Sequence, residues 1–360
     1  MIMLYTRLIF FVSTILILAY PAYSSALNND YGLTTEDQLF SPAKKNAIQK
    51  FLEGTRKGAF KGAGNITIRY RYTAKQGNKG GIVIVNGRGE SYLKYKETVY
   101  DLYRRGFSIY MYDHRGQGLS GRMVQDSQIG HVEDFSYYVR DLKKFYRQIV
   151  AKKEKGDIYL LAHSMGGAVA ALYLEKDPED FRAAVLSSPM MEINSGIIPA
   201  VVASRLANWL KDAGKLMGWS PTYIPFTGPY EKKPFSENHL THSPIRYKAL
   251  ITSFYEKRPE IRLGGPSCQW VSEAFKASRI ARQNAGRITI PVLLLQAGQD
   301  KLVSAAGQRQ FCKNLAAGGK SRCEGEGPYI ISEAYHELLM EKDRYRIPAL
   351  TRIIDFFEAH

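Results

Sequence analysis

One short run of residues has the types and the order that are needed to activate a serine. Residues 162–167 read Ala-His-Ser-Met-Gly-Gly and follow an apolar run at residues 158–161. A serine hydroxyl is a weak nucleophile, so it needs a histidine base beside it and an exposed position at a sharp turn. Small residues must flank such a turn, because strand and helix backbones approach closely there. The run predicts a strand, a turn that presents Ser164, and a helix that begins at Met165.

Two later residues stand where an acid and a base are needed. Asp300 follows an apolar run at residues 291–295 through a glycine-containing turn, and His336 follows the short apolar run 329–331. In parallel sheets the carboxyl ends of the strands meet at one edge, and the order serine, acid, histidine suits such a sheet. We expect Ser164 to be the nucleophile, His336 the general base, and Asp300 the residue that orients the imidazole.

A negative charge develops on the carbonyl oxygen under attack and needs two backbone N–H groups aimed at it. Met165, directly after the serine, is expected to supply the first. The second is assigned to Arg88 in the glycine-rich loop 86–90, Asn-Gly-Arg-Gly-Glu, which follows an apolar run. This loop lacks the Lys-Ser/Thr pair of a nucleotide-binding loop, so it favours an oxyanion site over a phosphate cradle.

The elements that must position these residues alternate along the chain. Runs typical of strands occur at residues 66–73, 81–85, 108–112, 158–162, 183–187, 290–295 and 329–331, and helical patterns at 94–105, 132–153, 165–175, 304–315 and 345–359. Strands that alternate with helices predict an α/β fold with a mostly parallel central sheet and helices on both faces.

The interval 190–287 interrupts this alternation. It is rich in aromatic and apolar residues and contains a helical pattern at residues 200–216. We interpret it as a largely helical cap, inserted between a first part of the core at residues 26–189 and a second part at 288–360. The cap residues Trp209, Trp270 and His242 are candidates for contact with the substrate.

Residues 1–25 form a separate unit. Arg7 precedes an apolar run at residues 8–20, and small residues follow, which is the pattern of a secretory signal peptide. An uncleaved membrane anchor is the alternative. The pattern predicts export to a periplasmic or membrane-associated location, or secretion. The formal net charge of +16 favours an anionic membrane surface as a partner over nucleic acid, for which the sequence has no motif.

The predicted export bears on the three cysteines, because exported proteins can form disulfide bonds. Cys312 and Cys323 flank a short polar loop, and in an oxidising compartment this spacing predicts a disulfide bond. Cys268 is then left unpaired, and we expect it to be buried. The histidines and cysteines show no spacing typical of metal ligands, so the sequence predicts no metal site.

Several motifs together resemble the monoacylglycerol lipase and lysophospholipase branch of the α/β-hydrolases. They lie at residues 86–90, 113–120, 162–167 and 336–337, and further stretches at 130–135, 240–244, 263–267 and 336–341 are similar to bacterial lysophospholipases of that branch. The resemblance implies an α/β-hydrolase fold, a helical lid, hydrolysis of a single acyl ester, and no cofactor. The chain departs from the family at Asn86, where histidine is usual, and at Ala162, where glycine is usual.

These observations lead us to expect a serine esterase that cleaves the single acyl ester of lysophospholipids. Its products would be a free fatty acid and a glycerophospho-alcohol. The same site would also suit a monoacylglycerol lipase, a carboxylesterase, or acyl transfer between lysolipids. An alternative of another class is a non-catalytic lipid-binding protein, against which the set Ser164, Asp300 and His336 argues. No obligate protein partner is inferred, and the preferred head group and acyl length are left open.

Overall fold

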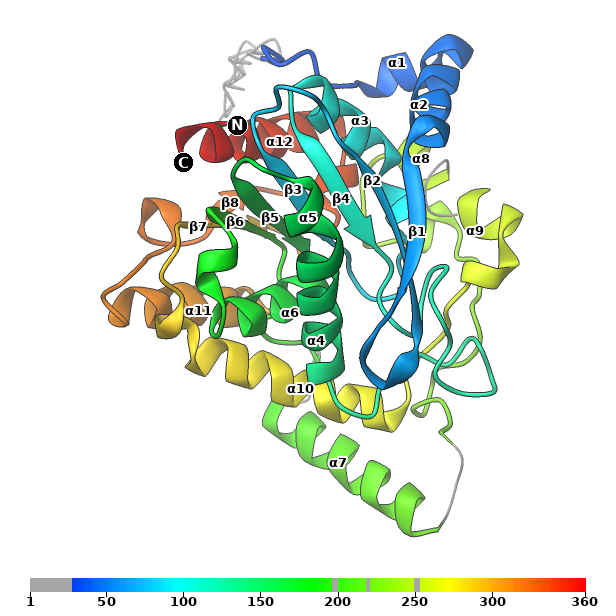
Figure 1. The fold of residues 1–360 in the computed structure, drawn as a ribbon. Coiled ribbons are helices and arrows are strands. Elements are labelled where there is room, and N and C mark those ends of the chain that lie inside the picture. The colour runs from blue at the N-terminus through cyan, green and yellow to red at the C-terminus, as the bar shows by residue number, and fades with distance from the viewer. Residues whose placement is uncertain (1–27, 196–199, 218–220, 249–252) are drawn as a thin grey trace, which may run out of the picture.

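A single eight-stranded sheet forms the centre of the molecule (Figure 1). The computed structural model describes residues 28–195, 200–217, 221–248 and 253–360, so the predicted signal peptide lies outside the described residues. The strands are β1 (Arg56–Lys61), β2 (Thr67–Thr73), β3 (Gly81–Val85), β4 (Ser108–Tyr112), β5 (Ile158–His163), β6 (Ala183–Ser187), β7 (Val292–Ala297) and β8 (Tyr329–Ile331). Their order is β1-β2-β4-β3-β5-β6-β7-β8. The β1–β2 and β2–β4 pairs are antiparallel, and all later pairs are parallel. The predicted α/β class with a mostly parallel sheet is confirmed.

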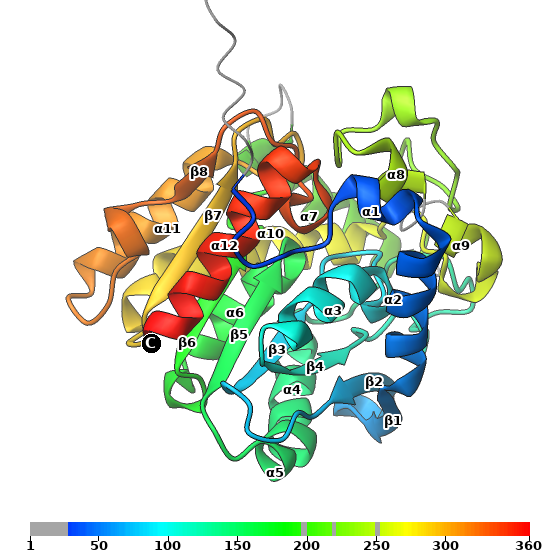
Figure 2. The ribbon, with the colours of Figure 1, turned by 90° about the horizontal axis from the view of Figure 1, so that it is seen from above.

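Helices cover both faces of this sheet (Figures 1 and 2). One face packs against α4 (Ser136–Phe145), α6 (Met165–Leu174), α10 (Cys268–Gln283) and α11 (Ala305–Ala317). The other packs against α3 (Lys96–Arg104) and α12 (Asp343–Ala359), with α2 (Pro42–Gly54) beside α3. Strand β3 shows why both helix layers are needed. Val83 and Val85 belong to the hydrophobic cluster on the side of α4, α6, α10 and α11, here called the first cluster. Ile82 and Ile84 belong to the cluster on the side of α3 and α12, the second cluster. Successive side chains of a strand point to opposite faces, so an apolar strand must be covered twice.

The remaining helices are α1 (Glu36–Phe40), α5 (Ala151–Lys153), α7 (Ala200–Leu216), α8 (Pro244–Arg246) and α9 (Ser253–Lys257). In Figure 1, α7, α8 and α9 lie outside the two helix layers. Helix α10, in contrast, belongs to the core layer, because it packs against α6 and α11 as well as against α7. The interval 190–287 that the sequence assigns to a cap therefore includes one helix of the core layer. No helix within the described ranges is long and apolar enough to cross a membrane.

Several predicted elements have somewhat different bounds in the structure, and two of these differences have a local cause. The helix expected at residues 132–153 begins only at Ser136, where the Asp134 carboxylate accepts the Ser136 N–H at 2.7 Å, and it passes through a π-helical turn at Tyr146–Val150. Such a local bond between a side chain and the backbone competes with helical hydrogen bonding, so the residues before it do not join the helix. The strand expected from residue 290 begins at Val292, because Pro291 has no N–H to donate to the sheet.

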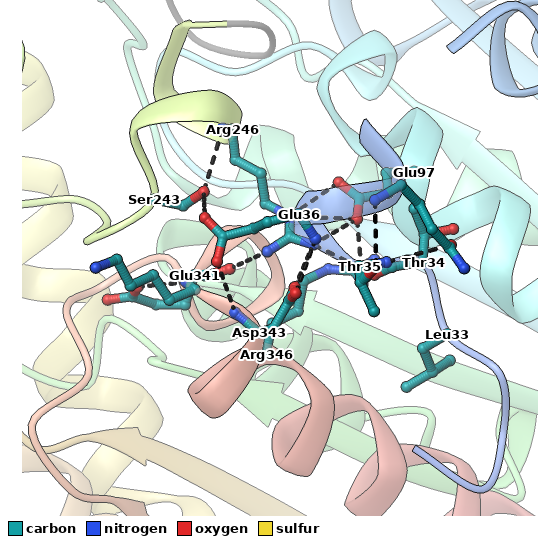
Figure 3. A network of polar contacts seen from close by, with 12 residues as sticks. Leu33, Thr34, Thr35, Glu36, Glu97, Ser243, Arg246, Glu341, Asp343 and Arg346 are labelled. Carbon is teal, nitrogen blue, oxygen red and sulfur yellow. Dashed lines mark hydrogen bonds and ion pairs between the residues drawn. The ribbon is translucent and has the colours of Figure 1, made fainter. Parts of the chain in front are cut away.

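Two buried arginines tie the N-terminal segment, α3, α8 and α12 together (Figure 3). Arg246 of α8 lies 2.9 Å from Glu97 of α3 and 2.8 Å from Asp343 of α12. Arg346 of α12 lies 3.2 Å from the same Glu97 and donates to the carbonyl of Thr34 at 3.0 Å. Each guanidinium thus has carboxylates and carbonyls around it, and four distant parts of the chain share one polar network.

Two of the three cysteines lie in the second part of the core, and the third begins α10. Cys312 of α11 is joined to Cys323 by a disulfide bond, which ties this helix to the segment before β8. Cys268, the first residue of α10, is unpaired and only half-buried, so the expectation that it is buried is wrong.

Candidate active site

Ser164 stands at a strained turn between β5 and α6. Its φ of 53° lies in the left-handed region that non-glycine residues rarely adopt. A Cβ on Gly166 would lie 2.2 Å from the Val85 carbonyl oxygen, and a Cβ on Gly167 would lie 2.4 Å from Cβ of Pro189. Both glycines are therefore required by the close approach of neighbouring backbone. Ala162 is fully buried within the first hydrophobic cluster, where its methyl group is accommodated.

The three residues expected to form a catalytic triad lie within hydrogen-bond distance of one another. His336 Nε2 is 2.9 Å from Ser164 Oγ, and His336 Nδ1 is 2.7 Å from Asp300 Oδ2. The other carboxylate oxygen of Asp300 accepts the N–H groups of Leu302 and Val303, which fixes the acid. With its proton on Nδ1, the imidazole leaves Nε2 free to accept the proton of the serine hydroxyl. The residues come from the carboxyl ends of β5, β7 and β8, as parallel strands require.

The loop after β3 approaches the serine closely. A Cβ on Gly87 would lie 3.2 Å from Ser164 Cβ. The loop is held by Glu90, whose carboxylate accepts the Gly87 N–H at 2.8 Å, and by the Gln117 side chain, which donates to the Gly87 carbonyl at 2.7 Å. Among the described residues, no hydrogen bond uses the N–H of Arg88 or of Met165 as its donor. Both groups are thus available to an oxyanion beside the serine.

A buried cluster of charged side chains, which the sequence did not predict, lies behind this turn. Lys94 Nζ is 2.5 Å from Glu90 Oε1 and 2.6 Å from Glu337 Oε1, and all three side chains are buried. His163 Nε2 is 3.3 Å from Glu337 Oε2. The cluster connects the loop after β3, the strand that carries the serine and the segment that carries His336. Its members come from three separate parts of the chain, so no local motif could have revealed it.

The charges in this cluster balance. Burial lowers the pKa of His163, but the carboxylates of Glu337 and Glu90 outweigh burial and raise it. His163 Nδ1 faces the Ser187 carbonyl at 3.2 Å while Nε2 faces the carboxylates, so both nitrogens face acceptors and the imidazolium form suits the site. Glu90, His163 and Glu337 also offer atoms close enough to hold a metal ion. The Lys94 ammonium binds both of these carboxylates and supplies the positive charge instead.

Asn86, the departure from the usual histidine, has a supporting place in the same loop. Its side chain faces Asp113 at 3.5 Å, and its carbonyl lies 3.1 Å from His114 Nε2. Asp113 accepts the N–H groups of Tyr92 and Leu119 at 2.6 and 2.7 Å. Burial raises the pKa of Asp113 to about 7. This carboxyl group organises the loops beside the site and does not touch the serine or the histidine of the triad.

The three candidates for substrate contact occupy different places. Trp209 is exposed on the outer face of α7, whereas Trp270 of α10 is buried, with its indole N–H donating to Tyr138 at 3.2 Å. The Arg88 guanidinium lies 5.0 Å from the centre of the Trp270 ring, so Trp270 borders the loop after β3. His242 bonds Glu341 at 2.8 Å and stacks on the residue before His336. The structure does not bring the three together.

Comparison with known proteins places this geometry in a family. Residues 76–343 match the family Hydrolase_4, described as Serine aminopeptidase, S33. Lysophospholipase L2 of Escherichia coli (strain K12) is 37% identical over 326 residues, covering 91% of this chain and 94% of that protein. The monoacylglycerol lipase of Mycolicibacterium smegmatis is 23% identical and covers 79% of this chain and 91% of that protein.

A solved structure shares the fold. The crystal structure of Paleococcus ferrophilus monoacylglycerol lipase matches with a TM-score of 0.60 and 20% identity, covering 85% of this chain and 99% of that one. The family match spans more than half of the chain, and the sequence relationship to the Escherichia coli protein spans nearly all of both proteins. The chain therefore belongs to the lysophospholipase and monoacylglycerol lipase branch of the α/β-hydrolase superfamily, and it is an ester hydrolase.

Proposed function

We propose that this enzyme hydrolyses the single acyl ester of lysophospholipids through an acyl-enzyme on Ser164. The observation that carries the proposal is the pair of contacts at His336, 2.9 Å to the serine hydroxyl and 2.7 Å to Asp300. A nucleophile, a base and an orienting acid in this geometry are the parts that acyl transfer needs.

The first half of the reaction forms the acyl-enzyme. Ser164 Oγ attacks the ester carbonyl carbon while His336 Nε2 takes the hydroxyl proton, and Asp300 stabilises the resulting imidazolium. The N–H groups of Met165 and Arg88 donate to the oxyanion. The intermediate collapses when the imidazolium gives its proton to the leaving glycerol oxygen, which breaks the ester bond.

The second half releases the fatty acid. A water molecule enters in place of the alcohol, and His336 takes its proton as the water oxygen attacks the acyl carbon. The second tetrahedral intermediate uses the same two N–H groups. Its collapse returns the proton to Ser164 Oγ and frees the fatty acid, so the enzyme ends as it began.

The choice of lysophospholipid is supported by the relatives. The protein at 37% identity is named a lysophospholipase, whereas relatives named monoacylglycerol or monoglyceride lipases are 23% and 27% identical. Monoacylglycerols and short carboxylic esters would enter the same triad chemistry, so a side-by-side assay decides. We expect purified protein to release fatty acid from lysophosphatidylcholine and lysophosphatidylethanolamine with a higher kcat/KM than from 1-monoacylglycerol or a nitrophenyl ester. Equal or lower values for both lysophospholipids would contradict the proposal.

The outer face of α7 supports a peripheral contact with a membrane. Val202, Leu206, Trp209 and Leu216 are exposed and recur at helical spacing, so they form one apolar stripe. Arg205 is exposed on the same helix, and the whole chain carries a net charge of +16. An apolar stripe with cationic residues suits an anionic lipid surface. We expect the double variant Leu206→Ser, Trp209→Ser to sediment less with phosphatidylglycerol vesicles, whereas the control Phe40→Ser on α1 does not change binding.

Export of the mature enzyme completes the proposal. Support comes from the signal-peptide pattern at residues 1–25 and from the Cys312–Cys323 disulfide, a bond that persists in oxidising compartments. We expect the chain expressed in a Gram-negative host to appear in the periplasm with its N-terminus near residue 26. A cytoplasmic protein that keeps residues 1–25 would contradict this part of the proposal.

A further inference from the structure

Arg88 belongs to the loop beside Ser164, and its guanidinium has no acidic partner among the described residues. Its Nη2 donates to the Gly264 carbonyl at 2.7 Å, and the group lies 5.0 Å from the centre of the Trp270 ring. Its Nε is buried and has no hydrogen-bond partner. In the part of the chain that the structure describes, no carboxylate lies within ion-pair distance of Arg88. The residue as a whole is half-buried.

Other buried arginines of this protein are treated differently. Arg115 lies 2.7 Å from Asp141, Arg246 lies 2.9 Å from Glu97, and Arg346 lies 2.8 Å from Asp101. Removing a charge from water is costly unless a counter-charge and hydrogen bonds replace the water. Burial lowers the pKa of Arg88 to about 10, which still leaves the group charged at neutral pH. No carboxylate among the described residues neutralises this cation, so it is available to an external anion.

The position of Arg88 relative to the reaction identifies the anion. In the proposed mechanism its backbone N–H binds the oxyanion, so the ester carbonyl lies against this residue. A lysophospholipid carries its phosphate only a few bonds from that ester, across the glycerol, a span comparable to an arginine side chain. A monoacylglycerol has a hydroxyl at the same place. Arginine matches phosphate oxygens with its planar fork of N–H donors.

We propose that the Arg88 side chain binds the phosphate of the lysophospholipid head group while its backbone N–H serves the reacting carbonyl. This inference rests on the proposed function. One residue then distinguishes lysophospholipids from neutral monoacyl esters.

The main test measures a ratio of two substrates in the full mature enzyme. The substrates are a short-chain lysophosphatidylcholine and the monoacylglycerol with the same acyl chain, both below their micelle concentrations. We expect Arg88→Met to lower the ratio of their kcat/KM values by about 10- to 100-fold, the usual effect of losing a hydrogen bond between charged groups. Arg88→Lys keeps the charge without the fork and should give an intermediate ratio. The control Arg140→Met removes an exposed charge from α4 and should leave the ratio unchanged.

A second test needs no variant, so it stands even if Arg88→Met fails to fold. Hydrolysis of nitrophenyl butyrate by the natural enzyme is measured with sn-glycero-3-phosphocholine, glycerol or inorganic phosphate added. We expect competitive inhibition by sn-glycero-3-phosphocholine at concentrations about tenfold or more below those at which glycerol acts. Inhibition by inorganic phosphate at least as strong would show a site for free phosphate and overturn the assignment to the head group.

The outcomes separate this inference from the proposed function. If lysophospholipid is hydrolysed but Arg88→Met leaves the substrate ratio at its natural value, the role of Arg88 is refuted and the lysophospholipase activity stands. If glycerol inhibits as strongly as sn-glycero-3-phosphocholine, the inference is likewise refuted. If the natural enzyme releases no fatty acid from lysophospholipid while it hydrolyses the neutral esters, the proposed function fails and the inference fails with it.

Discussion

Arg246 and Arg346 lie among carboxylates, whereas Arg88 lies against a tryptophan ring and one backbone carbonyl. Arg246 and Arg346 both bind Glu97 (Figure 3). In addition, Arg246 binds Asp343 and Arg346 binds Asp101. The site of Arg88 has no such carboxylate among the described residues. Both regions remove a guanidinium at least partly from water, but among the described residues only the first supplies a carboxylate as its counter-charge.

The difference indicates what each region is for. A network with all its charges paired keeps segments together, and here it joins the N-terminal segment, α3, α8 and α12. Removing one partner from a network of this kind destabilises the fold. The Arg88 guanidinium has no carboxylate partner among the described residues, and the residue belongs to the loop beside Ser164, which suits an anionic ligand. Variants in the two regions should therefore change different measurements.

The largest effect is expected at the acid of the triad. Asp300→Asn keeps the shape of the side chain but does not hold the imidazole in the required tautomer, so we expect kcat to fall by about 10⁴-fold. The melting temperature should change little by comparison. Steady-state hydrolysis and thermal unfolding of the same preparation check both statements. A large loss of stability with kcat kept would place Asp300 on the structural side of the comparison.

Glu97→Gln should have the opposite signature. It removes the carboxylate that Arg246 and Arg346 share, and breaking a buried ion pair costs about 3–5 kcal/mol. We expect urea unfolding to show a loss of this order while kcat of the folded enzyme stays within about twofold. Glu256→Gln, which breaks the exposed pair with Lys232, is the matched control and should lower the stability far less, because water screens exposed pairs. Equal costs for the two variants would contradict the distinction.

Lys94→Met tests the buried charged cluster behind the Ser164 turn, which holds both the loop after β3 and the segment of His336. It leaves the Glu90 and Glu337 carboxylates buried with His163 as their nearest cation, so the loop after β3 and the His336 segment should both shift. We expect kcat to fall by about 10- to 100-fold, with a smaller change in KM, because misplaced catalytic groups act on the chemical step. A change confined to stability would make the cluster purely structural.

The same variant should change the dependence of stability on pH. Burial raises the pKa of Glu337, but Lys94 and His163 outweigh burial and hold it well below its usual range. A depressed carboxyl pKa contributes stability above about pH 4.5, and this contribution is lost as the pH falls through the depressed value. The difference in unfolding free energy between the natural protein and Lys94→Met should therefore be larger at pH 7 than at pH 3. An equal difference at both pH values would contradict this.

The smallest effect is expected at Arg122, an arginine that is bound by backbone carbonyls. Arg122 also has no carboxylate within ion-pair distance among the described residues, but both of its terminal nitrogens donate to backbone carbonyls, those of Gly116 and Glu260. Arg122→Met should cost about 1–2 kcal/mol of stability, as expected for lost hydrogen bonds, and should leave the lysophospholipid to monoacylglycerol ratio unchanged. A fall in that ratio as large as in Arg88→Met would mean that any carboxylate-free arginine has this effect.

The residues brought together at Ser164 were accessible to prediction because their signals are local. Strands β3, β4, β5 and β6 are short, apolar and bounded by turn residues, and each was expected within one residue of its bounds. A parallel sheet then brings the ends of β5, β7 and β8 to one edge. The order of Ser164, Asp300 and His336 along the chain was therefore enough to expect their meeting.

The charged clusters could not be predicted, because they depend on contacts between distant segments. Lys94 belongs to a predicted helix, and a lysine in a surface helix is ordinarily expected to face the solvent. In the structure it is buried between Glu90 and Glu337. The N-terminal elements α1, α2 and β1 were also not predicted, since their sequences are polar and their stability comes from packing on the core. The sequence suggests both Trp209 and Trp270 as candidates for contact with the substrate. Only the three-dimensional structure shows that the Trp209 ring is exposed and the Trp270 ring is buried.

Ser164 is the residue on which the proposed acyl-enzyme forms, so its removal tests the proposed reaction most directly. Fatty acid and glycerophospho-alcohol released from lysophosphatidylcholine should be measured together for the purified natural enzyme and for Ser164→Ala. We predict equal amounts of the two products from the natural enzyme and a rate at least about 10⁴-fold lower from the variant, as when the nucleophile of a triad is removed. Release by Ser164→Ala at a rate close to that of the natural enzyme would contradict the central claim.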